Sequence, residues 1–190
     1  MPNTPLIMKK ANLFCGKEAA DESNSNHLVL AELKLPTMEE QYVDHRPGGG
    51  PITIEIDLMV NRLEATFSLV GWSPQVAELF NSWVADDNWF TAYGYVQDQI
   101  TGEASQGIAL FRGRLGRAEP VNWRPGDLQH WNYSIRSILH YELVLADESL
   151  YLYDFANNTF LVGGVDRMAD INAQLQTGAT NISPIIVSSA

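Results

Sequence analysis

Two segments near the middle of the chain alternate regularly between apolar and polar residues. The apolar positions are Ile52, Ile54, Ile56 and Leu58 in the first segment and Leu63, Ala65, Phe67 and Leu69 in the second. The polar positions between them are Thr53, Glu55, Asp57, Glu64, Thr66 and Ser68. A period of two is typical of a β-strand with one face in the core and the other in solvent. With a turn near Asn61 and Arg62, the pattern predicts one hairpin whose apolar residues all face the core.

Further strands are predicted on both sides of this hairpin. They cover residues 12–15, 28–35, 89–97, 107–115, 133–145 and 150–155. In residues 133–145, the odd positions are expected to share one face of a single long strand. Turns with Gly, Asp and Asn separate the later strands, which favours antiparallel hairpins. The pattern therefore predicts a mainly β protein of about seven strands, built as an antiparallel β-sandwich or barrel.

Two helices interrupt the strands. Ser73 is a good N-cap and Pro74 suits the first helical turn, so a mid-chain helix is expected to begin there. Its apolar stripe would consist of Val76, Leu79, Phe80 and Trp83. A short C-terminal helix is predicted from the spacing of Met168, Ile171 and Leu175.

Residues 36–51 form a long connection that is polar and ends in three consecutive glycines. A loop of this length in a compact domain is usually functional or mobile. We expect residues 1–190 to form a single domain, with a flexible N-terminal arm at 1–11 and a flexible tail at 178–190. Residues 118–131 contain two prolines and are expected to be a loop insertion.

The composition is that of an ordinary globular protein, with 45% hydrophobic and 18% charged residues. The net charge is -11, from 23 acidic and 12 basic residues, and the densest basic group is Arg112, Arg114 and Arg117. Such a chain disfavours tight binding to nucleic acid but allows an acidic wall past which DNA slides. No signal peptide or membrane-spanning segment is predicted. The lone cysteine, Cys15, is expected to be buried and inert.

Catalytic and cofactor motifs were not found in the sequence. The four histidines have no metal-ligand spacing, the glycine run lacks the Lys-Ser/Thr of a phosphate-binding loop, and no GxSxG motif occurs. We therefore expect no catalytic residue, no metal and no cofactor. Two alternatives remain open at this point. One is a carbohydrate-binding module that uses Trp123 and Trp131, and the other is an enzyme that uses a carboxylate pair such as Glu55 and Asp57.

The order of elements resembles that of a known family. Leu33-Lys34-Leu35-Pro36 precedes the long loop to Gly50, and Ala65-Thr66-Phe67-Ser68-Leu69-Val70-Gly71-Trp72 leads into the capped helix. Val162-Gly163-Gly164-Val165-Asp166-Arg167 precedes the C-terminal helix. Together these segments resemble the major tail tube proteins of contractile-tailed phages, and the related tubes of tailocins and injection systems. The resemblance covers residues 12–175. A polar stretch at 18–26 and the loop at 118–131 depart from it.

The resemblance implies a structural subunit rather than an enzyme. Its members form hexameric rings that stack into a hollow tube, with strands joined in a continuous inner barrel. The implied partners are other copies of the chain, the sheath outside, tape-measure protein and DNA in the lumen, and baseplate and terminator proteins at the ends, without membrane insertion. The implied location is the virion tail, assembled in the host bacterial cytoplasm. A tail terminator or a secretion-system ring is the alternative role.

The resemblance also implies functional surfaces. The long loop after Pro36 would reach a neighbouring ring, and its candidate residues are Met38, Glu39, Glu40, Tyr42, Asp44, Arg46, Gly48, Gly49 and Gly50. The polar face of the predicted hairpin would line the lumen, with Thr53, Glu55, Asp57, Glu64, Thr66 and Ser68 as candidates. Because these six include no Lys or Arg, we expect an acidic lumen that repels DNA over about 8 Å at physiological salt.

Overall fold

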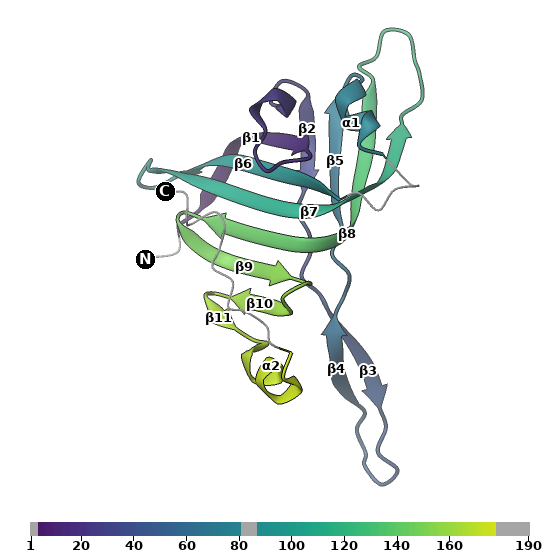
Figure 1. Cartoon of the computed structure of the whole chain (residues 1–190), viewed down its shortest axis with the longest axis vertical. Helices are drawn as coiled ribbons and strands as arrows, with labels where there is room; N and C mark the ends of the chain where they lie inside the picture. Colours follow the sequence, from purple (N-terminus) through teal and green to yellow (C-terminus); the bar gives the residue numbers. More distant parts are fainter. Residues whose placement is uncertain (1–3, 81–86, 178–190) are drawn as a thin grey trace.

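Most of the chain folds into one antiparallel sheet, and a two-stranded arm projects from it (Figure 1). The computed structural model describes residues 4–80 and 87–177. The nine-stranded sheet runs in the order β1-β6-β7-β8-β9-β10-β11, and β8 also pairs with β5, which pairs with β2. Its strands are β1 (Leu6–Gly16), β2 (Leu30–Lys34), β5 (Ala65–Val70), β6 (Asn88–Asp98), β7 (Ala104–Pro120), β8 (His130–Leu145), β9 (Glu148–Asp154), β10 (Thr159–Val162) and β11 (Val165–Asp166). The arm consists of β3 (Glu40–His45) and β4 (Ile54–Val60).

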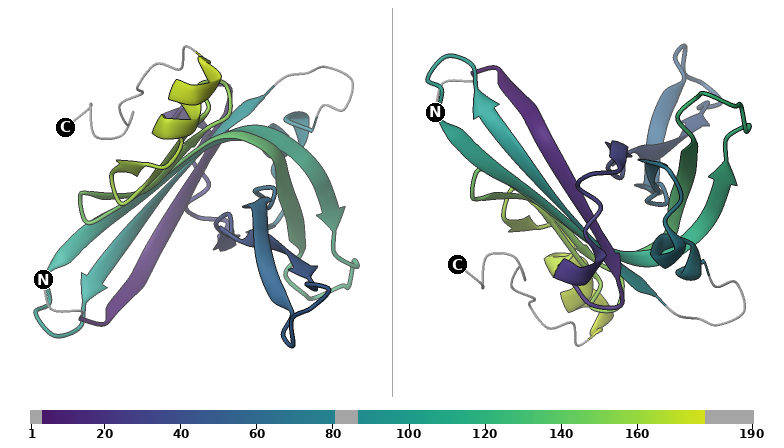
Figure 2. Two further views of the ribbon diagram at one scale, coloured as in Figure 1. Left: turned by 90° about the horizontal axis from the view of Figure 1, so that it is seen from below. Right: turned by 90° about the horizontal axis from the view of Figure 1, so that it is seen from above.

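The long strands β7 and β8 bend, so that the sheet folds over on itself (Figure 2). Their pairing register shifts between Arg112 and Arg114 and again between Leu115 and Arg117. On β8, Ser137 has a positive φ of 51° at the same level. Extra residues of this kind bend a strand and increase its twist. The bend divides the sheet into a long half that contains β1 and β6 and a short half that contains β2 and β5.

The core lies between these two halves. Phe67 from the short half stacks on Tyr133, with ring centroids 4.8 Å apart, and lies 6.4 Å from Phe90 of the long half. Phe90 in turn stacks on Phe111 at 5.6 Å. All four side chains are buried. Aromatic pairs of this geometry add to the stability that area burial supplies.

The mainly β fold class with two helices is confirmed, although the sheet is open rather than closed into a barrel. Helix α1 (Pro74–Glu78) begins as predicted, with the Ser73 hydroxyl accepting a hydrogen bond from the Val76 amide at 3.4 Å. It is shorter than predicted, and Trp83 lies outside the described residues. Helix α2 (Ala169–Leu175) lies where the sequence predicted it.

Several predicted boundaries are wrong. Residues 6–11 belong to β1 and not to a flexible arm, and the expected loop at 118–131 is reduced by the ends of β7 and β8. The single face predicted for residues 133–145 is confirmed in part, since Tyr133, Ile135 and Tyr141 are buried in the core and Leu143 packs against it, but the pattern is interrupted near Ser137, where the pairing with β7 shifts. Ile138 and His140 are also buried, although their positions are even. The predicted flexible tail at 178–190 lies outside the described residues.

Candidate functional site: the assembly surfaces

The arm is a hairpin exposed along its whole length. β3 and β4 pair with each other and with no other described strand. Facing residues such as Val43 and Ile56, or Asp44 and Glu55, occupy the same side of the ribbon. One side therefore carries Val43, His45, Ile54 and Ile56, and the other carries Tyr42, Asp44, Glu55 and Asp57. An isolated two-stranded hairpin is marginally stable in water, and an exposed apolar side of this kind is typical of an interaction surface.

The predicted inter-ring loop is part of this arm rather than a structureless connection. Glu40, Tyr42 and Asp44 lie on β3, and the Tyr42 hydroxyl donates a hydrogen bond to the Glu40 carboxylate. Glu39 directly precedes β3, and Arg46 directly follows it. The turn at the tip of the arm contains Gly48, Gly49 and Gly50. Met38 alone is partly buried, and it packs against the core. Sequence analysis did not predict β3, because apolar and polar residues alternate only weakly in Glu40–His45.

The predicted hairpin of residues 52–58 with residues 63–69 is wrong. β4 pairs with β3, whereas β5 pairs with β2 and β8. The apolar residues Ile54, Ile56 and Leu58, expected in the core, are 43–53% exposed. The six candidates for the lumen are consequently divided, with Glu55 and Asp57 on the arm, Thr53 just before it, and Glu64, Thr66 and Ser68 on or beside β5.

The short half of the sheet has one polar face, opposite the core. Four strands contribute to it in the order β2-β5-β8-β7. One row across the four strands consists of Lys34, Thr66, Ser134 and Arg117. Another row consists of Glu32, Ser68, Asn132 and Glu119. The alternate rows, which include Phe67 and Tyr133, point into the core.

Charges of both signs share this polar face. Its carboxylates are Glu32, Glu64 and Glu119, and its cations are Lys34, Arg114, Arg117 and Arg136. The prediction of an acidic face without Lys or Arg is therefore wrong for this sheet, because β2, β7 and β8 bring cations beside β5. Most of these charges are paired inside the subunit. Arg136 lies 3.2 Å from Glu64, and Arg117 lies 2.7 Å from Glu119.

The Glu64 carboxylate is held by its neighbours on the polar face. It accepts a hydrogen bond of 2.7 Å from the Ser134 hydroxyl. That bond, together with Arg136, lowers the pKa of Glu64 below its usual value. The polar face is thus a network of short side chains and paired charges.

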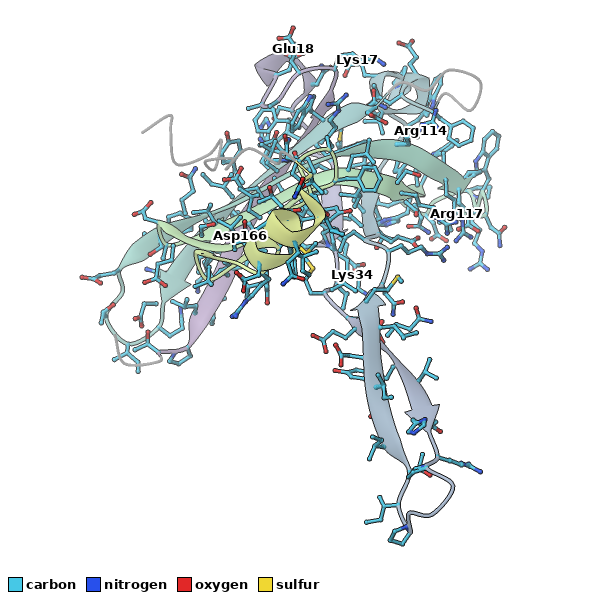
Figure 3. All side chains as sticks on the ribbon, turned by 60° about the horizontal axis from the view of Figure 1, so that its bottom comes forward. Lys17, Glu18, Lys34, Arg114, Arg117 and Asp166 are labelled. Carbon is cyan, nitrogen blue, oxygen red and sulfur yellow. The ribbon has the colours of Figure 1, made fainter. Side chains whose placement is uncertain are left out.

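The four-stranded half has two open edges. β2 pairs with β5 on one side only, and no other described strand pairs with its outer side. β6 pairs with β7 only as far as Gly113, so the outer side of residues 114–120 has no partner strand in the described part of the chain. Figure 3 shows Lys34 near the start of the arm and Arg114 and Arg117 along β7. Open edges of this kind are templates for pairing with another chain.

A sequence model of the family described as phage tail tube protein FII matches residues 6–175. The chain belongs to this phage tail tube family. Members of the family are structural proteins and not enzymes, so the chain has a structural role in a tail tube.

Solved structures share the tail tube fold at low sequence identity. A chain of the structure "Cryo-EM structure of the anti-feeding prophage (AFP) baseplate, 6-fold symmetrised" is 12% identical, with a TM-score of 0.50, over 75% of this chain and 97% of that one. A chain of an extracellular contractile injection system, from the "PVC sheath/tube terminator in extended state", is 8% identical, with a TM-score of 0.51, over 76% and 99%. The comparison with curated proteins gave no match.

A buried ionic cluster lies on the long half of this tail tube subunit. His140 Nδ1 lies 3.0 Å from an Asp154 oxygen, and His140 Nε2 lies 3.9 Å from a Glu142 oxygen. Burial acts to lower the pKa of His140, but the two carboxylates outweigh it and raise the pKa. Trp89 packs against the imidazole edge, and Arg112 is the neighbour of His140 on β7. The sequence did not single out His140, since an isolated histidine in a strand carries no signal of its partners.

The geometry does not support the two alternatives to a tail tube role, a carbohydrate-binding module and an enzyme with a carboxylate pair. Trp123 is 81% exposed, but Trp131 stacks on Tyr133 at 6.4 Å and is partly buried, so the two do not form a sugar platform. Glu55 and Asp57 lie on the exposed arm. Cys15 is buried, as predicted, and burial raises the pKa of its thiol.

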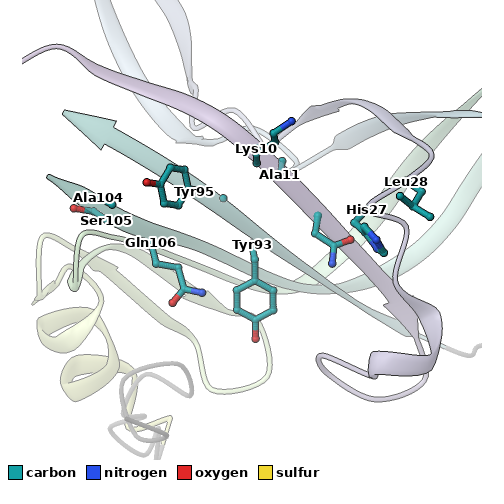
Figure 4. A pocket seen from close by; sticks show the side chains of 11 residues that line it. Lys10, Ala11, His27, Leu28, Tyr93, Tyr95, Ala104, Ser105 and Gln106 are labelled. Carbon is teal, nitrogen blue, oxygen red and sulfur yellow. The ribbon is translucent and has the colours of Figure 1, made fainter. Parts of the chain in front are cut away.

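An open groove crosses β1, β6 and β7 (Figure 4). Its volume is about 750 Å³, and Lys10, His27, Tyr93, Tyr95 and Gln106 contribute to its walls.

In the described part of the chain, no three His, Cys, Asp or Glu residues are placed to hold a metal ion. Among the described helices, none is long and apolar enough to cross a membrane.

Proposed function

We propose that this chain forms the hexameric rings that stack into the inner tube of a contractile tail. The observation that carries the proposal is the four-stranded sheet β2-β5-β8-β7 with both outer edges open. Successive strands in this sheet are antiparallel, so β2 and β7 run in opposite directions. When β2 of one copy meets β7 of the next, the new pair is also antiparallel. Head-to-tail repetition of this contact generates a ring without free edges.

Six-fold symmetry has support from the structural neighbours. The anti-feeding prophage baseplate that contains a similar chain is described as 6-fold symmetrised. A closed wall also explains why the subunit presents an open, curved sheet instead of a finished barrel. Closure supplies the missing strand partners.

The polar face of the ring-forming sheet is the proposed lining of the lumen. The opposite face is occupied by the core, so the polar face is the side left for the channel. Its Arg117 and Arg136 are each paired with a carboxylate. Paired cations neither attract phosphates strongly nor hold them. Passage of DNA or of a protein effector is therefore proposed to depend on charge balance and not on an acidic wall.

The arm is the proposed contact between stacked rings. It projects from the body beyond the end of the sheet (Figure 1), and Val43, Ile54 and Ile56 on its apolar side are exposed. A neighbouring ring would cover this side and order the hairpin. The sheath outside, the tape-measure protein inside, and baseplate and terminator proteins at the tube ends are the other proposed partners. The proposed location is the tail of a virion assembled in the host bacterial cytoplasm.

Shortening the arm tests this role. Glu40 and Val60 are paired, so residues 41–59 can be replaced by Asn-Gly, which suits a two-residue hairpin turn. Because every removed residue is exposed, the subunit should unfold at nearly the wild-type temperature. Electron microscopy should show single rings without stacked tubes. Normal tubes would exclude the arm as the inter-ring contact, and the absence of rings from wild-type protein would contradict the proposed function itself.

A further inference from the structure

The charges along the two open edges restrict how adjacent copies can align. On β2, Glu32 and Lys34 occupy consecutive positions of the polar face, and both are exposed. On β7, Glu119 is in the same row as Glu32, and Arg117 is in the same row as Lys34. Neither Glu32 nor Lys34 has an ion-pair partner in the described part of the subunit.

Two copies would meet at a seam in which β2 of one copy pairs with β7 of the next. In a level alignment, each row of one copy continues into the same row of the next copy, so that Glu32 would face Glu119 and Lys34 would face Arg117. This alignment would be unfavourable. Like charges directly opposite each other destabilise a pair of strands. Closed barrels also require their strands to be staggered, so a level seam is not expected on geometric grounds either.

The two smallest staggers that keep the polar faces together have different consequences. A side chain stays on the same face only when the shift is an even number of residues. A shift of two residues in one direction places Glu32 opposite Arg117, which is an attraction. The same shift places Lys34 opposite Arg114, which is a repulsion. A shift of two in the other direction brings Lys34 to Glu119, while Glu32 passes beyond the end of β7 to the level of Val121.

We propose that adjacent copies align in this last register, with a salt bridge between Lys34 of one copy and Glu119 of the next. The inference rests on the proposed ring and specifies its seam. This register has one attraction and no repulsion. It also gives a partner to Lys34, which has no ion-pair partner among the described residues of its own subunit. Glu119 then lies between Arg117 of its own strand and Lys34 across the seam.

Charge reversal tests the register through the sign of its effect. Lys34→Glu should raise the protein concentration needed for half of the subunits to form rings, by roughly tenfold, because an attraction becomes a repulsion at every seam. Glu119→Lys should do the same. The double variant Lys34→Glu/Glu119→Lys should assemble near the wild-type concentration. Sedimentation and electron microscopy measure assembly, and the effect of each single variant should shrink in about 0.5 M NaCl.

Glu32→Lys is the matched control, since it reverses a charge of the same size only two residues from Lys34, and it makes the same substitution as Glu119→Lys. In the proposed register Glu32 faces Val121, so assembly should stay within about twofold of wild type. A level seam predicts the opposite pattern, with Lys34→Glu and Glu32→Lys both assembling better. Thermal unfolding of each variant checks that the subunit is intact. Improved or unchanged assembly of Lys34→Glu, or no rescue by the double variant, would overturn the register, whereas wild-type protein that forms no rings would overturn the proposed function.

Discussion

Phe67 joins the two halves of the core, and its truncation should be among the most destabilising single changes in the subunit. The side chain is 3% exposed, stacks on Tyr133 at 4.8 Å and lies 6.4 Å from Phe90. Replacing a buried Phe with Ala costs about 3–5 kcal/mol, which includes the cavity left behind. Domains are typically stable by about 5–15 kcal/mol. The variant Phe67→Ala should therefore lose a large part of the free energy of unfolding.

Urea denaturation, followed by tryptophan fluorescence, measures this loss. With a slope of about 2 kcal/mol per molar urea, a cost of 4 kcal/mol lowers the midpoint by about 2 M. Phe155→Ala is the control, because Phe155 is 66% exposed, and its midpoint should stay within about 0.3 M of wild type. A midpoint for Phe67→Ala that falls by less than about 0.5 M would refute the assignment of Phe67 to the centre of the core. Since β5 is an inner strand of the ring-forming sheet, Phe67→Ala should also assemble poorly.

Two further predictions concern the ionic cluster and the arm. The raised pKa of His140 means that its protonated form stabilises the fold below about pH 6.5 and that this contribution is lost as pH rises through the folded pKa. His140→Gln should therefore lower the melting temperature more at about pH 6 than at about pH 9, and an equal loss at both would show that the imidazole is uncharged in the fold. Ile54→Thr/Ile56→Thr removes apolar surface from the arm and should weaken ring stacking with little change in subunit stability. The control Glu55→Gln, on the opposite side of the arm, should stack normally, and unimpaired tubes from the isoleucine variant would contradict an apolar inter-ring contact.

The sequence by itself determined which residues share a face of a strand. The alternation in residues 65–69 predicted a half-buried strand, and Ala65, Phe67 and Leu69 are all buried. The mainly β class and the capped start of α1 also followed from local patterns, because strand alternation and N-cap chemistry involve only neighbouring residues.

Only the tertiary structure decided which strands pair and which faces are covered. The alternation at residues 54–58 is as regular as that at 65–69, yet Ile54, Ile56 and Leu58 are exposed, because β4 pairs with β3 outside the body. An alternation with a period of two residues shows which side chains share a face of the strand. It does not show whether another element covers that face. The pairing of β5 with β2 and β8 likewise placed Arg117 and Arg136 beside Glu64, which converted an expected acidic face into a balanced one. Those contacts join residues up to about seventy positions apart, and alternation within one strand carries no information about them.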